Sequence, residues 1–500
     1  MEKINLIAAD IGAGSGRIYL STYDGDRISS EEVHRFSNSP MLLGNTLYWD
    51  ILKIMDELGK GLGKARQAAG GKIKGIGIDS WGADFGLLDS SGYLLSNPVS
   101  YRDKRIFTAE EEMKKLMPPD ELDEYNSSLT YNHCTLNQLY YLYKYQKDLA
   151  GAAQIYLPIA DLISYFITGI KAVDISMLSG SQFFNVKDRK LLTGHLEGLG
   201  INKKIIPPVT DAGTVLGNIK AGYAEAIGID PGIKVSLVCG HDTASAVTGM
   251  PFSGKDDPCF INSGTWSVMG LESSDAVTGK EAFKNNFTNW NGYRDRILFL
   301  KIFNGFYFIQ ECKKIWDSSG SSPGSYEDLY KGITRDDAAP SLIDLENRSL
   351  LLPGGAMTEK IEVYLKDTGQ RSGISKKEIL ISLMHSIVLE YKLVLDQLRD
   401  FSEKDIGSIY MVGGGSLNPV FCQWTADCLG TDIYTGFPES TISGNALVQL
   451  IALGEVKSIE EGRAVIKDSY EEKIYSPRKD QESQWGKFED KYKKLKKMDI

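Results

Sequence analysis

The first residues that could do chemistry are an aspartate and a run of small residues near the start of the chain. Asp10 follows residues 4–9, whose apolar character predicts a buried strand. The residues after it are Gly12, Ala13, Gly14, Ser15, Gly16 and Arg17. Glycines at such a place let backbone N–H groups gather around an anion, because no Cβ blocks the approach. This composition is typical of a phosphate-binding turn.

Two kinds of phosphate-binding turn fit that composition. A dinucleotide-binding loop must open a helix whose N-terminus takes the pyrophosphate. Here residues 18–23 alternate at period two and meet Asp24 and Gly25, which is a hairpin signal. We therefore predict a phosphate-binding β-hairpin, of the kind that begins the actin, heat-shock-ATPase and sugar-kinase superfold.

Two further strands are predicted to end in polar residues. Residues 73–78 form a short apolar run that stops at Asp79, Ser80, Trp81, Gly82, Ala83 and Asp84. Residues 234–238 predict another strand, followed by a turn into a helix at Gly240, His241, Asp242 and Thr243. A strand that stops at a small, polar cluster usually lines a cleft.

The opening pattern recurs in the second half of the chain. Residues 259–261 are apolar, residues 262–265 are small and polar, and residues 266–269 return to strand character. A strand at 409–412 then leads into three glycines, 413–415, where a flat ring could lie against bare backbone. Two hairpins, each near the start of a half, suggest duplicated domains around one nucleotide.

The elements expected between these motifs are mostly helical. Helices are predicted at 51–69, 136–145 and 160–166, and a long one follows the capping box of Ser375 and Glu378. Trp485, Phe488, Tyr492 and Leu495 fall at helical spacing, which predicts a terminal helix docked by one face with its lysines in solvent.

Length and composition limit the classes of protein. Five hundred residues exceed one core, so we expect two domains, 1–250 and 251–500. A formal net charge of −10 argues against nucleic-acid binding. The six cysteines show no metal-ligand or redox spacing. Without a leader or an apolar span the expected protein is cytoplasmic, a monomer or homodimer that does not bind membranes.

At this point the motifs resemble those of a known family. The chain resembles the FGGY carbohydrate kinases, and within them the rhamnulokinase (L-rhamnulose kinase) branch, over nearly its whole length. The matching motifs are Asp10–Gly12 with Ser15–Arg17, residues 78–82, residues 101–103, residues 241–247, residues 263–267, residues 413–415 and residues 439–445. The resemblance implies an α/β fold of two actin-like (ribonuclease H-like) ATPase domains with a nucleotide and sugar cleft between them.

The resemblance also implies roles for particular residues. Asp242 would accept the proton of a ketose C1 hydroxyl, and Gly82, His241 and Thr243 would contact the sugar. ATP would be bound by Ala13, Gly14, Ser15, Gly16, Arg17, Thr265, Gln310 and Gly414. Asp10 would hold Mg²⁺ through water, because Mg²⁺ keeps much of its hydration shell. The domain 1–250 would thus bind sugar and phosphate and supply the catalytic base, and the domain 251–500 would bind the adenine nucleotide. The implied reaction is ATP-dependent phosphorylation of L-rhamnulose; the alternative substrates are L-fuculose, xylulose, ribulose and glycerol.

Simpler structural roles remain open for several of these residues. Asp242 could cap a helix, which is an ordinary role for aspartate and is compatible with catalysis. A solitary histidine such as His241 is more often a satisfied core residue, and Trp81 could serve packing alone. Asp10 could bond nearby N–H groups at its strand end.

The chain also departs from the rhamnulokinase pattern. Lys301-Ile302 stands where the branch usually has Lys-Asn with the asparagine on the sugar, and Asn304 could replace it only if the local path shifts. Cys134 replaces an asparagine before Thr135, and residues 353–356 read Pro-Gly-Gly-Ala. An unpaired buried polar group costs about 1–3 kcal/mol, so such changes can alter sugar choice.

Three rival functions differ from this one, of which another FGGY kinase acting on fuculose, xylulose, ribulose or glycerol stays open. A sugar-responsive repressor needs a DNA-binding helix pair before the first strand, which here begins at residue 4. A chaperone-like or filament-forming ATPase would lack the base at Asp242. The chain has no GxxxxGK[ST] loop, which excludes a P-loop kinase.

Overall fold

The computed structural model describes residues 3–117, 134–252, 258–320, 324–352, 354–402, 405–437 and 439–498. The chain divides into two compact units. Unit 1 comprises residues 1–252, 272–299 and 439–471, and unit 2 comprises residues 253–271, 300–438 and 472–500. Residues 253–255, at the expected boundary, and Pro353 lie outside the described ranges. Within those ranges every helix is too short or too polar to cross a bilayer.

Unit 1 is built on a six-stranded sheet in the order β13-β14-β6-β1-β2-β3. Its strands are β1 (Ile4–Ile11), β2 (Ser15–Tyr23), β3 (Ile28–Ser37), β6 (Ile73–Ser80), β13 (Val215–Asn218) and β14 (Lys234–Ser236). The β1–β2 pair is antiparallel, whereas β1–β6 and β6–β14 are parallel. The predicted hairpin and both later strands are confirmed.

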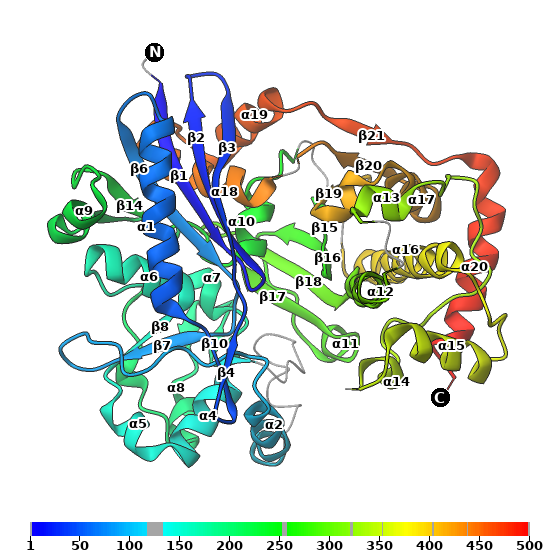
Figure 1. The fold of residues 1–500 in the computed structure, drawn as a ribbon, viewed down its shortest axis with the longest axis horizontal. Helices are drawn as coiled ribbons and strands as arrows, with labels where there is room; N and C mark the ends of the chain where they lie inside the picture. The colour runs from blue at the N-terminus through cyan, green and yellow to red at the C-terminus, as the bar shows by residue number, and fades with distance from the viewer. Residues whose placement is uncertain are drawn as a thin grey trace. The chain divides into compact units, whose positions relative to one another are not determined.

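Helices cover both faces of this sheet (Figure 1). Successive side chains of a strand point to opposite faces. Ile7 and Ile11 of β1 therefore share a buried cluster with Leu58 of α1 (Ile51–Ala68), while Ala8 packs with Ile442 of α18 (Ser440–Ala452). The helix predicted at 51–69 is thus confirmed, but α18 comes from a segment almost 200 residues beyond the boundary expected for the first domain.

Smaller elements complete unit 1. They are β4 (Met41–Leu43), β5 (Thr46–Tyr48), β7 (Phe85–Leu88), α2 (Arg105–Leu116), α4 (Thr135–Tyr145), α5 (Lys147–Ala152), β8 (Ile155–Pro158), α6 (Ile159–Thr168), β9 (Val173–Asp174), α7 (Ile175–Leu178), β10 (Phe184–Asn185), β11 (Lys190–Leu191), α8 (Thr193–Gly198), β12 (Val209–Thr210), α9 (Ala221–Ile227), α10 (Asp242–Thr248), α11 (Lys280–Lys284), β17 (Phe287–Asn291) and α19 (Ile459–Ser469). The helices predicted at 136–145 and 160–166 correspond to α4 and α6.

The second sheet repeats the pattern of the first. Its order is β17-β18-β16-β15-β19-β20-β21, where β15 (Cys259–Ser263) is antiparallel to β16 (Trp266–Ser273) and parallel to β19 (Ser408–Val412). β19 is in turn parallel to β20 (Asp432–Thr435). In both sheets the first strand of a hairpin therefore pairs with a parallel strand, and that strand pairs with a further parallel strand, which confirms the duplication predicted from the two hairpin motifs.

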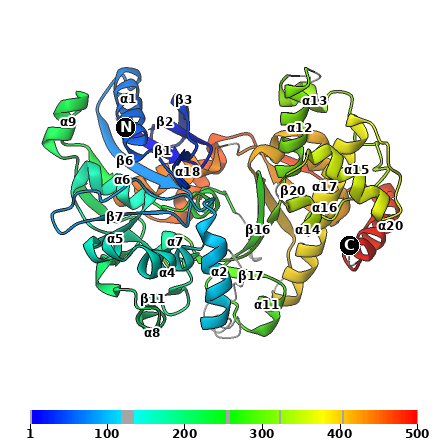
Figure 2. The ribbon, with the colours of Figure 1, turned by 60° about the horizontal axis from the view of Figure 1, so that its bottom comes forward.

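Helices of unit 2 gather around α16 (Figure 2). The helices are α12 (Tyr307–Ser318), α13 (Tyr326–Tyr330), α14 (Arg348–Leu351), α15 (Met357–Asp367), α16 (Lys376–Phe401), α17 (Pro419–Leu429) and α20 (Glu482–Leu495), and the remaining strands are β18 (Ile297–Asn304) and β21 (Lys473–Tyr475). The capping box of Ser375 and Glu378 at the start of α16 is confirmed.

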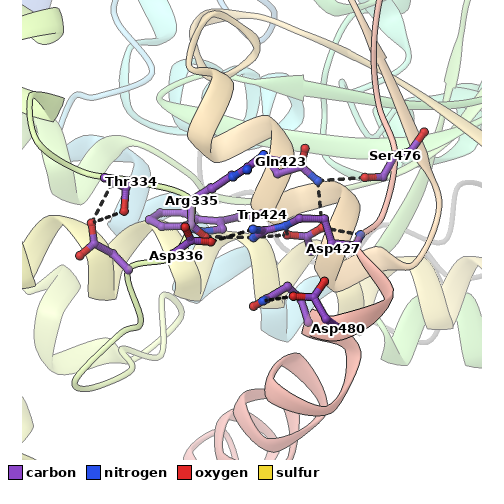
Figure 3. Close-up of polar contacts among 11 residues, drawn as sticks. Thr334, Arg335, Asp336, Gln423, Trp424, Asp427, Ser476 and Asp480 are labelled. Atoms are coloured by element: carbon purple, nitrogen blue, oxygen red, sulfur yellow. Dashed lines mark hydrogen bonds and ion pairs between the residues drawn. The ribbon is translucent and has the colours of Figure 1, made fainter.

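The end of the chain is fastened to unit 2 by polar contacts as well as by packing. Arg478 donates from Nε and Nη2 to Asp427 Oδ2 of α17, at 3.0 and 2.8 Å, and from Nη1 to Asp336 at 2.8 Å (Figure 3). On α20, Trp485, Tyr492 and Leu495 are buried as predicted. The expectation that all its lysines are solvated is wrong for Lys496, because its Nζ lies 2.8 Å from the buried carboxylate of Glu390.

Candidate active site

The first part of the site is the turn between β1 and β2 in unit 1. Gly12 N–H donates to the carbonyl of Ser15 at 3.0 Å, and the side chain of Asn38 donates to the carbonyl of Gly12 at 2.8 Å. Ala13 and Gly14 form the tip, and a Cβ added at Gly14 would have no described atom within 4 Å. The turn is therefore held from behind and open at its tip, where backbone could approach a phosphate.

Gly16 is needed for a different reason from Gly14. A Cβ at Gly16 would collide with the ring of Phe36 on β3. None of the glycines of this turn has a positive φ. Glycine at position 16 thus lets the turn pack closely against β3, and glycine at position 14 leaves the tip of the turn uncovered. Neither glycine is required for an unusual backbone conformation.

Asp10 and Arg17 face each other across the same hairpin. They are register partners on β1 and β2, and Arg17 Nη2 lies 2.5 Å from Asp10 Oδ2. Arg17 Nη1 also donates to Glu439, the residue before α18, at 2.8 Å. Burial raises the pKa of Asp10, and nearby Asp242 and Glu439 add to the rise while Arg17 opposes it. The guanidinium of Arg17 therefore joins two carboxylates that are more than 400 residues apart in sequence.

A second buried carboxylate lies beside Asp10. Asp79 is its register partner on the parallel strand β6, and its Oδ2 accepts from Asn445 of α18 at 2.6 Å. Its Oδ1 has no hydrogen-bond partner in the described part of the chain. Burial and the charge of Asp10 raise the pKa of Asp79 well above its ordinary value, which favours its neutral form. The sequence marked Asp79 only as part of a polar cluster.

The expected base, Asp242, is the first residue of α10. The capping position itself belongs to His241. Thr243 N–H lies 2.5 Å from Asp242 Oδ1 and 3.2 Å from His241 Nδ1, so we assign this N–H to the carboxylate. His241 Nδ1 is 2.9 Å from the same oxygen, which makes it a second donor.

These donors keep Asp242 ionised while leaving it accessible. Loss of water around the turn acts to raise the pKa of Asp242, but the bonds from His241 and Thr243 outweigh it and the pKa lies below its ordinary value. The Asp242 side chain is 37% exposed, against 12% for His241. An oriented, ionised and reachable carboxylate can accept a proton from a bound hydroxyl.

The turn that carries His241 and Asp242 is positioned by residues that the sequence did not single out. Asp174 Oδ2 accepts from Gly240 N–H at 2.9 Å, and Ser176 Oγ accepts from His241 N–H at 3.1 Å. Ser80 N–H donates to the carbonyl of Gly240 at 2.8 Å. These contacts connect loops that are distant in sequence, and no local pattern would have revealed them.

His241 lies between a glycine and an aromatic ring. A Cβ at Gly82 would be 2.8 Å from His241 Nε2, so only glycine fits there without a shift. On another side the ring of Trp290 from β17 lies 4.4 Å from the imidazole, tilted by 42°. The structure therefore brings the expected sugar-contact residues Gly82, His241 and Thr243 together with Asp242.

The expected nucleotide residues of unit 2 also gather. Thr265, at the β15–β16 turn, exchanges hydrogen bonds with Gln310 of α12 at 2.9–3.1 Å. Gly413 has φ 81°, and a Cβ there would be 2.7 Å from the carbonyl of Ser263. Gly414 is exposed, and a Cβ on it would have no described atom within 4 Å. The glycine run is thus packed against the β15–β16 turn with its middle residue open.

Two of the residues connected with the departures from the rhamnulokinase pattern, Asn304 and Cys134, make hydrogen bonds within the protein. Asn304, the suggested substitute for an asparagine at 302, is buried and donates to the carbonyl of Leu345 at 3.0 Å. Ile302 is half-buried on β18. Cys134 is buried, which raises the pKa of its thiol to about 12, and it donates to Gln182 at 3.0 Å.

Comparison with known proteins identifies the class. Residues 5–249 match the model of the FGGY family of carbohydrate kinases, N-terminal domain, and residues 259–453 match that of its C-terminal domain. The chain therefore belongs to the FGGY family of carbohydrate kinases. It is an enzyme that phosphorylates a sugar with ATP.

Within this family, the chain is similar to several proteins whose activity is assigned. A rhamnulokinase of Enterococcus faecalis is 33% identical over 95% of this chain and 94% of its own, and one of Bacillus subtilis is 30% identical over 94% and 95%. Among solved structures, a ligand-bound xylulose kinase from Lactobacillus acidophilus gives a TM-score of 0.78 at 18% identity, covering 99% of this chain and 98% of that one. A Plasmodium falciparum glycerol kinase with ADP gives 0.77 at 13%, covering 99% and 98%. The predicted two-domain kinase fold is confirmed.

Proposed function

We propose that the chain phosphorylates L-rhamnulose at its C1 hydroxyl. The observation that carries the chemistry is Asp242, an exposed carboxylate held in one orientation by His241 and Thr243. The identity of 30–33% to rhamnulokinases along nearly the whole chain supports the choice of sugar.

Each group has a role in this proposal. Asp242 takes the proton from the C1 hydroxyl as its oxygen attacks the γ-phosphorus in line, and the bond from that phosphorus to the β,γ-bridging oxygen breaks to release ADP. Gly82, His241 and Thr243 bind the sugar. Ala13, Gly14, Ser15, Gly16, Arg17 and Thr265 bind the β- and γ-phosphates, and Gln310 and Gly414 make the remaining nucleotide contacts.

A magnesium ion fits the residues present. No group of three or more metal-ligating side chains is arranged as a cage in the described ranges. Mg²⁺ needs no cage, because it is commonly bound by one or two carboxylates, water and substrate phosphates. We propose that Asp10 is the carboxylate and that the bound ion neutralises charge on the phosphates. The unpartnered Oδ1 of Asp79 lies on the neighbouring strand, where it could accept a bond from the ion's water.

The setting of the enzyme follows from its substrates. Both are small soluble molecules, and all six cysteines lie in described segments, buried and unpaired, as is usual where thiols stay reduced. We propose a cytoplasmic enzyme that acts as a monomer or homodimer and has neither nucleic acid nor membrane as a partner.

A second acceptor is favoured by one observation. Ile302 cannot hydrogen-bond through its side chain, and Asn304 is engaged with Leu345. The missing hydrogen bond at position 302 would weaken the binding of L-rhamnulose. It would weaken less the binding of a ketose that has no hydroxyl opposite this position, or has it in another orientation. L-Fuculose is the first such candidate, followed by the ketoses xylulose and ribulose; glycerol completes the set of acceptors to be tested.

A panel assay tests the proposal. ADP formation is measured with L-rhamnulose, L-fuculose, D-xylulose, L-ribulose and glycerol, and the phosphorylated carbon is located by NMR. The highest kcat/KM is expected for L-rhamnulose, with phosphate on C1. If glycerol or D-xylulose outperformed both 6-deoxy-ketoses, the substrate assignment would be wrong and only the kinase class would stand.

A further inference from the structure

The turn after β6 contains a residue in an unfavourable conformation. Ala83 has φ 76°, in the left-handed region that residues with a Cβ rarely adopt. It follows Gly82, the residue that touches His241. Strained backbone persists only where the surrounding structure holds it, and such positions often occur at functional sites.

Helix α4 holds Ala83 by its carbonyl. Thr135 Oγ1 donates to that oxygen at 2.9 Å, and Gln138 Nε2 donates to it at 3.1 Å. Both side chains are buried. The Tyr156 hydroxyl is hydrogen-bonded to Thr135 in turn. One carbonyl therefore receives two buried donors from the first turn of a helix that is 50 residues away in sequence.

Asp84, the next residue, is held as firmly. It is 1% exposed, and its Oδ2 accepts from Trp49 Nε1 at 2.6 Å and from Trp81 Nε1 at 2.9 Å. The two indole rings lie 4.4 Å apart. Its Oδ1 accepts from Gln138 at 3.0 Å. Gln138 therefore contacts both residues that follow Gly82.

The other side of the turn meets the catalytic segment. Ser80 N–H donates to Gly240, and Gly82 leaves no room for a Cβ beside His241 Nε2. Gly82 thus has neighbours of two kinds. Helix α4 fixes the two residues after it, and the His241 ring leaves no room for a side chain on it. A change of Ala83 toward ordinary φ would move the Gly82 backbone relative to His241 and Asp242.

We propose that Thr135 and Gln138 are positioning residues for the sugar. They hold Ala83 in the left-handed conformation, and that conformation sets the Gly82 backbone at the distance from His241 that the acceptor requires. Neither residue touches the sugar; both act through Ala83. This inference rests on the proposed function, because it takes Gly82 and His241 to be the sugar contacts.

Substitution of Ala83 by glycine tests whether backbone strain is the reason that α4 must hold this turn. Glycine adopts positive φ without steric cost, so Ala83→Gly should keep the left-handed conformation and no longer need the hold. The sugar KM, the sugar dissociation constant from calorimetry without ATP and the ATP KM are expected to stay within twofold, and stability is not expected to fall. Arg294→Gly, at another non-glycine residue with positive φ (54°), is the matched control, and its sugar affinity is also expected to be unchanged.

Thr135 is tested by a matched pair. Thr135→Val removes the hydroxyl at nearly constant volume and is expected to weaken sugar binding at least threefold, whereas Thr135→Ser keeps the hydroxyl and is expected to bind like the original. In the double variant Ala83→Gly/Thr135→Val, sugar affinity should return to within twofold of the original, because glycine keeps the left-handed conformation without the hold. Arg294→Gly combined with Thr135→Val should bind the sugar as weakly as Thr135→Val alone.

The outcomes distinguish this inference from the proposed function. If the double variant Ala83→Gly/Thr135→Val binds the sugar as weakly as Thr135→Val alone, the positioning role through Ala83 is overturned, while the assignment of the sugar site stands. If no member of the ketose panel binds or turns over with the unaltered chain, it is the proposed function that fails. Equal sugar affinity in Thr135→Val and Thr135→Ser would also overturn the positioning role.

Discussion

Asp10 and Asp79 occupy paired positions on the parallel strands β1 and β6, yet each has a different kind of partner. Asp10 is bound to the cation of Arg17 at 2.5 Å, whereas Asp79 accepts from the neutral amide of Asn445 at 2.6 Å. Burial raises the pKa of both carboxylates. The charge of Arg17 is the main opposition to that rise at Asp10, whereas the hydrogen bond from Asn445 is the main opposition at Asp79.

Replacing Asp242 by asparagine should remove catalysis and leave binding. Asparagine keeps the shape and a hydrogen-bond acceptor for Thr243 but cannot take a proton, so sugar-dependent ADP formation is expected to fall by about 10²–10⁴-fold. ADP affinity, measured by calorimetry, should stay within about twofold. Turnover within about threefold of the original would rule Asp242 out as the base.

Restoring asparagine at position 302 should favour L-rhamnulose selectively. Ile302 lies on β18, where the side chain offers no hydrogen bond. Ile302→Asn is expected to raise kcat/KM for L-rhamnulose by up to about tenfold, the equivalent of one hydrogen bond worth about 1.4 kcal/mol. Ile302→Leu is the matched control. A gain shared equally by all ketoses would contradict a specific contact.

Asp84 should make stability depend on pH. Burial raises its pKa to about 6 in the folded chain, against the ordinary 3.8. The neutral acid is therefore favoured by folding: its stabilisation is complete below about pH 4 and is lost as pH rises through about 6, a difference of about 3 kcal/mol. Asp84→Asn does not titrate, so its free energy of unfolding should gain about 2 kcal/mol on the original between pH 4 and 7.

The titration of Asp84 is tested by the difference in unfolding free energy between the original chain and Asp84→Asn. Lost hydrogen bonds in Asp84→Asn shift its stability by the same amount at every pH, whereas titration changes the difference with pH. Denaturant unfolding at pH 4, 5, 6 and 7 measures it. A difference that stays constant over this range would mean that Asp84 does not titrate there.

Glu439 should affect the nucleotide and not the sugar. It holds Arg17 Nη1 at 2.8 Å, beside the open phosphate turn. Glu439→Gln weakens one of the two charged contacts that orient the guanidinium, so the KM for ATP is expected to rise by about threefold to tenfold, the scale of one charge-assisted hydrogen bond at a partly exposed site. The sugar KM is measured in parallel; a change there alone would argue against this role.

The network in Figure 3 gives a stability prediction for unit 2. The Asp427 side chain is fully buried, and that of Arg478 is 18% exposed. Asp427→Asn leaves the guanidinium without its buried carboxylate partner, with only the exposed Asp336 carboxylate remaining among those described, and a loss of about 2–4 kcal/mol of unfolding free energy is expected. Asp480, an exposed residue of the same close-up, accepts from Gln481 Nε2 at 3.0 Å, and Asp480→Asn should change stability by less than about 0.5 kcal/mol. Equal effects of the two would contradict the argument.

Periodicity and turn residues were enough to predict the local elements. The β1–β2 hairpin followed from period-two alternation and Asp24-Gly25, α16 from its capping box, and α20 from four apolar residues at helical spacing. These signals are local, because hydrogen bonds and side-chain faces within one element set them. The grouping of Gly82, His241 and Thr243 with Asp242 was expected from family resemblance and could not follow from spacing alone.

Interactions between segments that are distant in the chain could not be predicted from the sequence. Glu439 lies in one of the family motifs and no role was predicted for it, yet it accepts a hydrogen bond from Arg17. No sequence pattern indicated Asp174 or Ser176, yet they accept hydrogen bonds from the backbone of Gly240 and His241. Ala83 gave no sign of positive φ, since alanine has no preference for it. Such contacts depend on where the chain returns, which no local pattern records.

The position of α18 has a consequence for how the protein is made. Gln449 donates to the carbonyl of Ile7 at 2.9 Å, and Asn445 supplies the donor for Asp79, so the sheet of unit 1 is completed by residues that a ribosome adds long after the strands of that sheet. Domains usually fold in order as they emerge. Here the nascent first half must wait, with one sheet face uncovered, until α18 has been translated. Synthesis of this kinase should therefore depend on chaperones that shield that face, and a fragment ending near residue 252 should aggregate.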